Sequence, residues 1–90
     1  MSTVALKLKI LPSSLDINLD EVQAQALTVM ESLGSQNTSF VQDPIAFGLK
    51  ALIITTAWPE VTSVDEAENK LAEISGVSSV EVLDYRRAFG

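Results

Sequence analysis

Adjacent carboxylates are the first groups in this sequence that could support acid–base chemistry. They occur as two pairs, Asp20-Glu21 and Asp65-Glu66. A general acid and a general base need carboxyl groups held in different environments. Both pairs fall instead where helices are expected to begin, and negative charge in a first turn complements the helix dipole. We therefore interpret both pairs as helix-stabilising groups rather than as catalytic ones.

The sequence offers few residues that could act as activated nucleophiles or metal ligands, and no phosphate-binding loop. The serine pairs Ser13-Ser14 and Ser78-Ser79 have no histidine to activate them, because the chain contains none. Histidine and cysteine are both absent, which removes the commonest zinc ligands and any disulfide. The four glycines are scattered and form no phosphate-binding loop. We expect no covalent chemistry, no cofactor and no metal site.

The remaining candidates would act by binding, and the first is the basic pair Arg86-Arg87. It lies in an acidic chain that has 12 acidic against six basic residues and a net charge of −6. One interpretation is a charged edge strand that discourages pairing with other chains. The other is a cation presented to a partner's phosphate or carboxylate groups. The sequence alone leaves both interpretations open.

The second candidate is the Phe47-Gly48 step, which is followed closely by Lys50. Phe47 is either an ordinary core residue or an aromatic side chain placed at a strand end to fill a partner's pocket. Trp58, at the far end of the next strand, is expected to cap the core. These residues need a scaffold, which the hydrophobic pattern predicts.

Four strands are expected. Residues 3–10 alternate between apolar and polar and predict a half-buried strand. Residues 40–47 contain Pro44, which cannot donate a ladder hydrogen bond, so this strand belongs at a sheet edge. Residues 49–58 are apolar on both faces, as a central strand should be. Residues 77–87 predict the last strand.

Two helices are expected between these strands. The first begins near Asn18, which has capping-box spacing to Glu21, and ends before Gly34. Its apolar face should comprise Val22, Ala26, Val29 and Leu33. The second begins at Ser63, which has the same spacing to Glu66, and ends at Gly76. Its apolar face should comprise Val64, Ala67, Leu71 and Ile74.

The order strand, helix, strand, strand, helix, strand predicts an α+β, ferredoxin-like βαββαβ sandwich. Its antiparallel sheet should have the order 4-1-3-2, with two helices on one face. Residues 1–90 are expected to form a single domain. From this connectivity we also expect Phe47-Gly48, Lys50 and Arg86-Arg87 to share one rim of the sheet, with Trp58 at the opposite rim.

Charge and hydropathy limit the partners and the location. An acidic surface repels phosphate backbones, so no direct nucleic-acid binding is expected. The longest apolar runs are far below the ~20 residues needed to span a bilayer. The first residues contain no basic segment followed by an apolar one, as a signal peptide would. We expect a cytoplasmic protein that does not bind membranes, and a monomer is plausible.

Two segments carry a family resemblance. "PIAFGLKALII" and "SGVSSVEVLDYRR" resemble parts of translation elongation factor 1-beta, above all its archaeal type, which consists of the guanine-nucleotide exchange domain alone. The resemblance covers essentially the whole chain. It implies a ferredoxin-like fold, binding to the elongation factor 1-alpha GTPase, and exchange of GDP for GTP during protein synthesis.

The resemblance also implies roles for individual residues. Phe47, before Gly48, matches an aromatic residue that contacts the GTPase. Arg87 matches a lysine near the carboxyl end that disturbs the GTPase's magnesium site, and Arg86 could share or take this role. Two departures are visible: the cation is an arginine, and three residues, 88–90, follow it. Gly48 and Lys50 complete the expected partner-binding set.

The competing hypothesis is a ferredoxin-like small-ligand-binding or oligomerisation module. Such a module would be expected to carry a glycine-rich loop between a strand and a helix, and to form an obligate dimer. Residues 11–18, "LPSSLDIN", contain no glycine, which argues against it. An acyl-phosphate hydrolase of this fold would need an anion-binding arginine in the same loop, and none is there.

Overall fold

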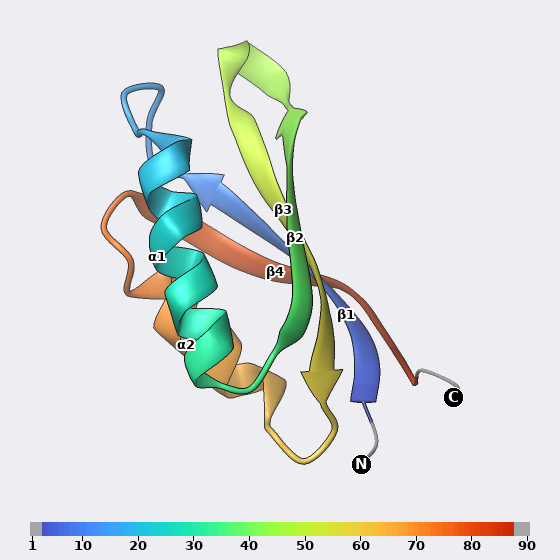
Figure 1. Ribbon diagram of the computed structural model, residues 1–90. Coiled ribbons are helices and arrows are strands. Elements are labelled where there is room, and N and C mark those ends of the chain that lie inside the picture. Colours follow the sequence, from blue (N-terminus) through green and yellow to red (C-terminus); the bar gives the residue numbers. More distant parts are fainter. Residues whose placement is uncertain (1–2, 88–90) are drawn as a thin grey trace.

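Residues 3–87 are described by the computed structural model of the protein, and they form one antiparallel sheet with helices on one face (Figure 1). The strand order is β2-β3-β1-β4. This is the expected order read from the other edge, so the predicted α+β, ferredoxin-like fold is confirmed. The elements are β1 (Thr3–Pro12), α1 (Leu19–Ser32), β2 (Gln36–Pro44), a 3-10 turn (Ala46–Gly48), β3 (Lys50–Pro59), α2 (Val64–Ala72) and β4 (Val77–Arg87).

The core lies between the sheet and the helices. On β1 the residues of one face are buried and those of the other are more exposed, as the alternating pattern predicts. Trp58, at the end of β3, is fully buried and donates its indole Nε1–H to the Thr62 carbonyl oxygen at 2.9 Å. The predicted role of Trp58 in capping the core is therefore confirmed. The buried hydrophobic residues comprise Val4, Leu6, Leu8, Ile10, Val22, Ala26, Met30, Ala51, Leu52, Ile54, Trp58, Ala67, Leu71 and Ile74.

Side-chain caps fix where both helices begin. The Asn18 Oδ1 atom accepts hydrogen bonds from the backbone N–H groups of Asp20 and Glu21 at 2.9 and 3.3 Å. The Ser63 Oγ atom accepts one from the Asp65 N–H at 3.2 Å. These bonds satisfy N–H groups that a helix leaves unpaired at its first turn. Both predicted start points are confirmed.

The second strand differs from its predicted range of 40–47. It runs from Gln36 to Pro44, and its first part pairs with β3 through an irregular stretch in which Asn37 has φ +54°. Hydroxyl groups link this polar segment to β3: the Oγ1 atoms of Thr38 and Thr56 lie 2.9 Å apart across the pair, and the Thr56 hydroxyl donates to the Gln36 carbonyl. The edge position predicted from Pro44 is confirmed.

The expected shared rim is wrong. Val4, near the start of β1, pairs with Trp58 near the end of β3 and with Arg87 at the end of β4. The turn between β2 and β3 lies at the opposite end of the sheet, where Pro44 pairs with Lys50. Because neighbouring antiparallel strands run in opposite directions, the start of β1 faces the end of β3, not its beginning.

None of the helices within residues 3–87 is both long enough and apolar enough to cross a membrane.

Gly76 offers a test of how the link between α2 and β4 is built. It has φ +94°, and an added Cβ would lie 3.0 Å from Ile17 side-chain atoms. Left-handed backbone costs an L-residue about 1–2 kcal/mol, and crowding adds to this cost. We expect Gly76→Ala to lower the free energy of unfolding by about 1–3 kcal/mol, measured by urea denaturation. The neighbouring exposed Ser75→Ala should change it little, and equal effects would contradict this account.

Candidate functional site

Phe47 lies at the tip of the β2–β3 hairpin, at the upper end of the molecule in Figure 1. Its side chain is 92% exposed, so the interpretation of Phe47 as a core residue is wrong. Its backbone is left-handed, with φ +62° and ψ +30°. Such values are rare for a bulky residue and cost energy. An exposed aromatic residue in this conformation contributes nothing to the core and is well placed to meet a partner.

Two backbone hydrogen bonds hold the tip. The Ile45 N–H donates to the Leu49 carbonyl at 2.8 Å, and the Leu49 N–H donates to the Ala46 carbonyl at 3.3 Å. Gly48 continues the turn with φ +77°, a conformation that glycine adopts without cost. The bonds close the loop around Phe47, so its backbone is defined even though its side chain is in solvent.

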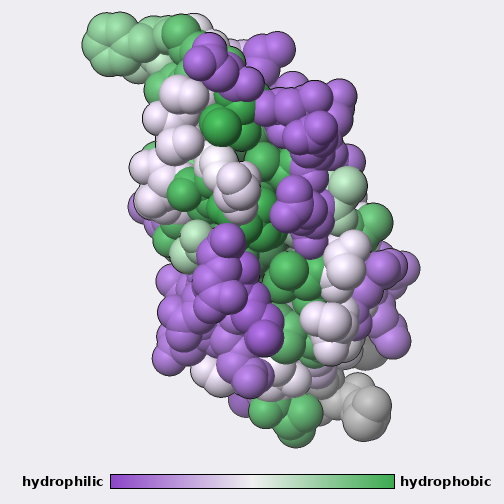
Figure 2. All heavy atoms as spheres, turned by 90° about the vertical axis from the view of Figure 1, so that its left-hand side faces the viewer, coloured by the Kyte–Doolittle hydropathy of each residue, from purple (hydrophilic) through white to green (hydrophobic). Residues whose placement is uncertain are grey.

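A second apolar side chain lies beside the tip. Leu15, from the loop between β1 and α1, is 65% exposed, and a Cβ added to Gly48 would lie 3.5 Å from the Leu15 Cδ2 atom. Figure 2 shows hydrophobic surface gathered at this end of the molecule, beyond the polar side chains that cover much of the helical face. Leu15 was not among the residues expected from the sequence. Its one signal is an isolated leucine among the polar residues of the loop.

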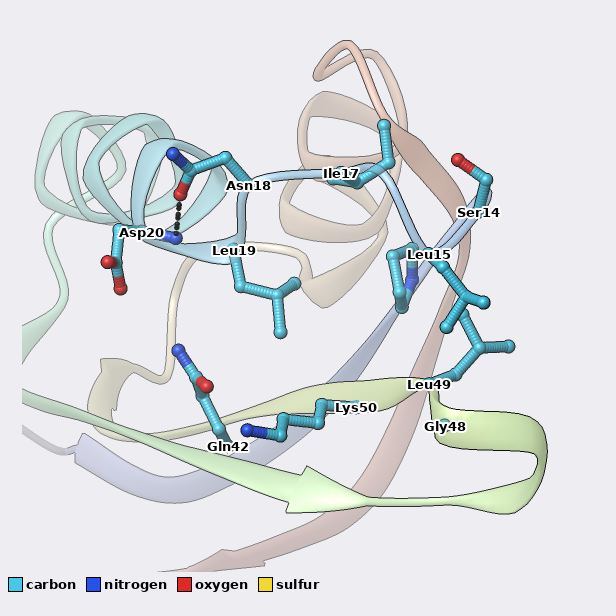
Figure 3. A pocket seen from close by; sticks show the side chains of 11 residues that line it. Ser14, Leu15, Ile17, Asn18, Leu19, Asp20, Gln42, Gly48, Leu49 and Lys50 are labelled. Carbon is cyan, nitrogen blue, oxygen red and sulfur yellow. Dashed lines mark hydrogen bonds between the residues drawn. The ribbon is translucent and has the colours of Figure 1, made fainter.

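Lys50 lies below the tip, at the start of β3. It borders a hollow of about 300 Å³ between the β1–α1 loop and the hairpin, and its ammonium group points along the hollow toward Gln42 (Figure 3). The amide oxygen of Asn18, which also lines the hollow, is already used to cap α1. The structure therefore brings Phe47, Gly48 and Lys50 together at one end, as predicted.

Arg86 and Arg87 lie at the other end, and they point to opposite faces of the sheet. Arg86 pairs with Ala5, on the face away from the helices, whereas Arg87 pairs with the buried Val4 and so lies on the helical side. Their side chains are 78% and 73% exposed. Either cation can reach a partner, but one partner surface cannot meet both from the same side.

Each arginine has its own carboxylate. The Arg86 Nε atom lies 3.0 Å from Asp84 Oδ2, two residues earlier on the same strand. The Arg87 Nη2 atom lies 2.9 Å from Oε2 of Glu60, a residue in the turn that follows β3. Glu60 was not among the residues expected from the sequence, because no local pattern connects it to Arg87. Residues 88–90, which follow the candidate cation, lie outside the described residues.

Within residues 3–87, no group of three or more histidine, cysteine, aspartate or glutamate side chains could hold a metal ion. The candidate residues at the hairpin end are the exposed Phe47 and Leu15 with Lys50 close by, and those at the β4 end are two exposed arginines that are each paired with a carboxylate.

The fold and the exposed groups at its two ends define a ferredoxin-like binding domain. Residues 5–87 match the EF-1 guanine nucleotide exchange domain. The chain is 40% identical over 88 residues to elongation factor 1-beta of Methanosarcina barkeri, with 97% of this chain and 99% of the relative covered. It is 41% identical over 90 residues to elongation factor 1-beta of Halorubrum lacusprofundi, with the same coverage. The relative from Archaeoglobus fulgidus is 33% identical over 86 residues, covering 93% of this chain and 96% of its own.

The chain belongs to the EF-1 guanine nucleotide exchange domain family. The function implied by the resemblance, guanine-nucleotide exchange for elongation factor 1-alpha in translation, is thereby confirmed. The family does not say which side chains of this chain carry out the exchange.

Proposed function

We propose that this protein promotes exchange by binding elongation factor 1-alpha through two separate contacts. Phe47 at the hairpin tip anchors the complex, with Gly48 and Lys50 beside it, and Arg87 at the end of β4, or Arg86 in its place, perturbs the nucleotide site. The observation that carries this proposal is the strained, 92% exposed Phe47. Strain of this kind persists where the surroundings enforce it, and it is concentrated at functional sites.

Binding alone is sufficient for exchange. A GTPase holds its nucleotide through backbone N–H groups and a magnesium ion that contact the phosphates. A factor that binds the empty GTPase more tightly than the loaded one must weaken nucleotide binding by the same ratio. Exchange therefore needs no nucleophile, no general base and no cofactor of the factor's own. We infer that the protein acts without covalent chemistry.

The shape of the domain sets how the two contacts are made. The part of the chain that the structure describes measures 40 × 21 × 18 Å, and the two candidate contacts lie toward opposite ends of it. They cannot enter one pocket of the GTPase. We infer that Phe47 binds one region of the partner while Arg87 reaches the magnesium and phosphate region, which a guanidinium can approach as a permanent cation.

The net charge of −6 and the partner suggest the setting in which the protein acts. We propose that it works in the cytoplasm as a single exchange domain of one chain per GTPase. An acidic surface disfavours direct contact with nucleic acid, so the partner rather than RNA is expected to bring the protein to translation.

The test is release of a fluorescent GDP analogue from elongation factor 1-alpha, with the exchange factor present in catalytic amounts. We expect Arg87→Ala to slow release about tenfold, because hydrogen bonds to charged groups are typically worth about 1.5 kcal/mol or more. Arg86→Ala is the matched variant and should have a smaller effect, since Arg86 lies on the other face of the sheet. A larger effect at Arg86 would assign the role to that residue. Unchanged release in both variants would contradict the proposed role of the β4 end.

A further inference from the structure

The ion pair between Glu60 and Arg87 connects elements that are not neighbours in the sheet. Glu60 follows Pro59, the last residue of β3, and Arg87 ends β4, while β1 lies between these two strands. The guanidinium must therefore reach across the start of β1 to meet the carboxylate at 2.9 Å. This contact directs the Arg87 side chain from the edge strand toward the turn after β3.

Glu60 is itself held in place. The turn that contains it is closed by a hydrogen bond from the Thr62 N–H to the Pro59 carbonyl at 3.1 Å. The Thr62 carbonyl accepts the 2.9 Å bond from the indole of the fully buried Trp58. These two hydrogen bonds tie the backbone of the turn to the core, and the Glu60 side chain that the turn carries is only 28% exposed. A flexible surface pair would lack this support.

The contact leaves Arg87 able to bind. A guanidinium has five N–H donors, and the Glu60 contact joins one nitrogen, Nη2, to one carboxylate oxygen. The side chain is 73% exposed, so most of it remains accessible to a partner. A long arginine side chain that is already ordered loses less conformational freedom when it binds.

We propose that Glu60 is a positioning residue for exchange, which orients the Arg87 guanidinium before and during contact with the nucleotide site of the GTPase. This inference rests on the proposed function of Arg87. Glu60 acts through Arg87 and contacts neither nucleotide nor magnesium itself. It gives the turn after β3 a functional role that the sequence pattern did not indicate.

A double-mutant cycle tests the inference. We would measure analogue release from elongation factor 1-alpha with Glu60→Ala, Arg87→Ala and the double variant. The matched control is Glu31→Ala, which removes the same charge from an exposed position on α1. We expect Glu60→Ala to slow release about two- to fivefold, the range that follows from the worth of a single ion pair near the surface. The double variant should be no slower than Arg87→Ala, and Glu31→Ala should match the wild type.

A second readout follows Arg87 directly. Relaxation of the Arg87 side-chain ¹⁵Nε nucleus should report a more mobile guanidinium in Glu60→Ala than in the wild type. A change in thermal stability alone would not produce the coupling between the two positions. The positioning role is supported only if mobility rises and release slows together.

Several results would overturn the inference. Unchanged release with Glu60→Ala would mean that the carboxylate does not position Arg87 for exchange. Faster release would mean that the carboxylate masks the Arg87 cation instead. An additional slowing of Arg87→Ala by the second substitution would mean that Glu60 acts independently of Arg87. An unchanged ¹⁵Nε relaxation would remove the physical basis. If Arg87→Ala itself leaves release unchanged, the proposed function of Arg87 fails and the inference fails with it. If Arg87→Ala slows release but Glu60→Ala does not, only the inference about Glu60 is removed.

Discussion

Phe47→Ala is expected to slow nucleotide release from elongation factor 1-alpha by about 30-fold or more. Aromatic residues at the centre of an interface commonly contribute about 2 kcal/mol or more, and about 1.4 kcal/mol corresponds to a factor of ten in rate. Phe47 is the most exposed aromatic side chain among the described residues and is closed in a defined turn. The substitution removes the ring without touching the core.

The controls separate binding from folding. Val41→Ala removes another exposed apolar side chain from the same hairpin, on the edge strand β2, and should leave release within about twofold of the wild type. Thermal unfolding of Phe47→Ala should resemble that of the wild type, because the side chain is in solvent. Normal exchange by a folded Phe47→Ala variant would contradict the anchor role, while leaving the family assignment intact.

Trp58→Ala is expected to give the largest loss of stability. Truncating a fully buried tryptophan typically costs about 3–5 kcal/mol. Trp58 has no exposed surface and also holds the turn after β3 through Thr62. For a domain of this size each kcal/mol lowers the melting temperature by about 4–8 °C, so we expect a decrease of at least about 12 °C. Circular dichroism is the suitable measurement, because the variant lacks the chain's one tryptophan as a fluorescent probe.

Val61→Ala is the matched control, since Val61 lies in the same turn and is 93% exposed. It should shift the melting temperature by only a few degrees, because surface substitutions usually change stability by less than about 0.5 kcal/mol. If the Trp58→Ala protein had the same melting temperature as the Val61→Ala protein, the indole would not be part of the cooperative core. Loss of any cooperative transition in Trp58→Ala would agree with the prediction.

The sequence was sufficient for the architecture because its local signals agree with one another. Asn18 and Ser63 have side chains that cap helices, and both do so. Pro44 has no backbone N–H and cannot hydrogen-bond to strands on both sides, and it lies on an edge strand. The first helix was predicted less well in detail: Met30 is fully buried, whereas Val29 and Leu33 only border the core. A stripe of residues at helical spacing gives the face but not the depth of each side chain.

The candidate site was less predictable, because it depends on relations between distant parts of the chain. The sequence is compatible with Phe47 as a core residue and as a surface residue, and only the geometry of the hairpin turn decides between them. Phe47 and Arg87 lie at opposite ends of the sheet because the end of β3, and not its start, lies beside the start of β1. The contact between Glu60 and Arg87 depends on the strand order, in which β1 lies between β3 and β4. Sequence patterns report local geometry, and these features are not local.

The left-handed backbone at Phe47 has a consequence for how this protein can change. Glycine adopts such a conformation freely, whereas a bulky residue is held there at a cost of about 1–3 kcal/mol. Selection for heat resistance alone would therefore favour glycine at this position, and selection for activity would favour keeping the aromatic residue. Stability and activity are opposed at this one position, so thermostable variants that arise without a functional screen should be checked first at the hairpin tip.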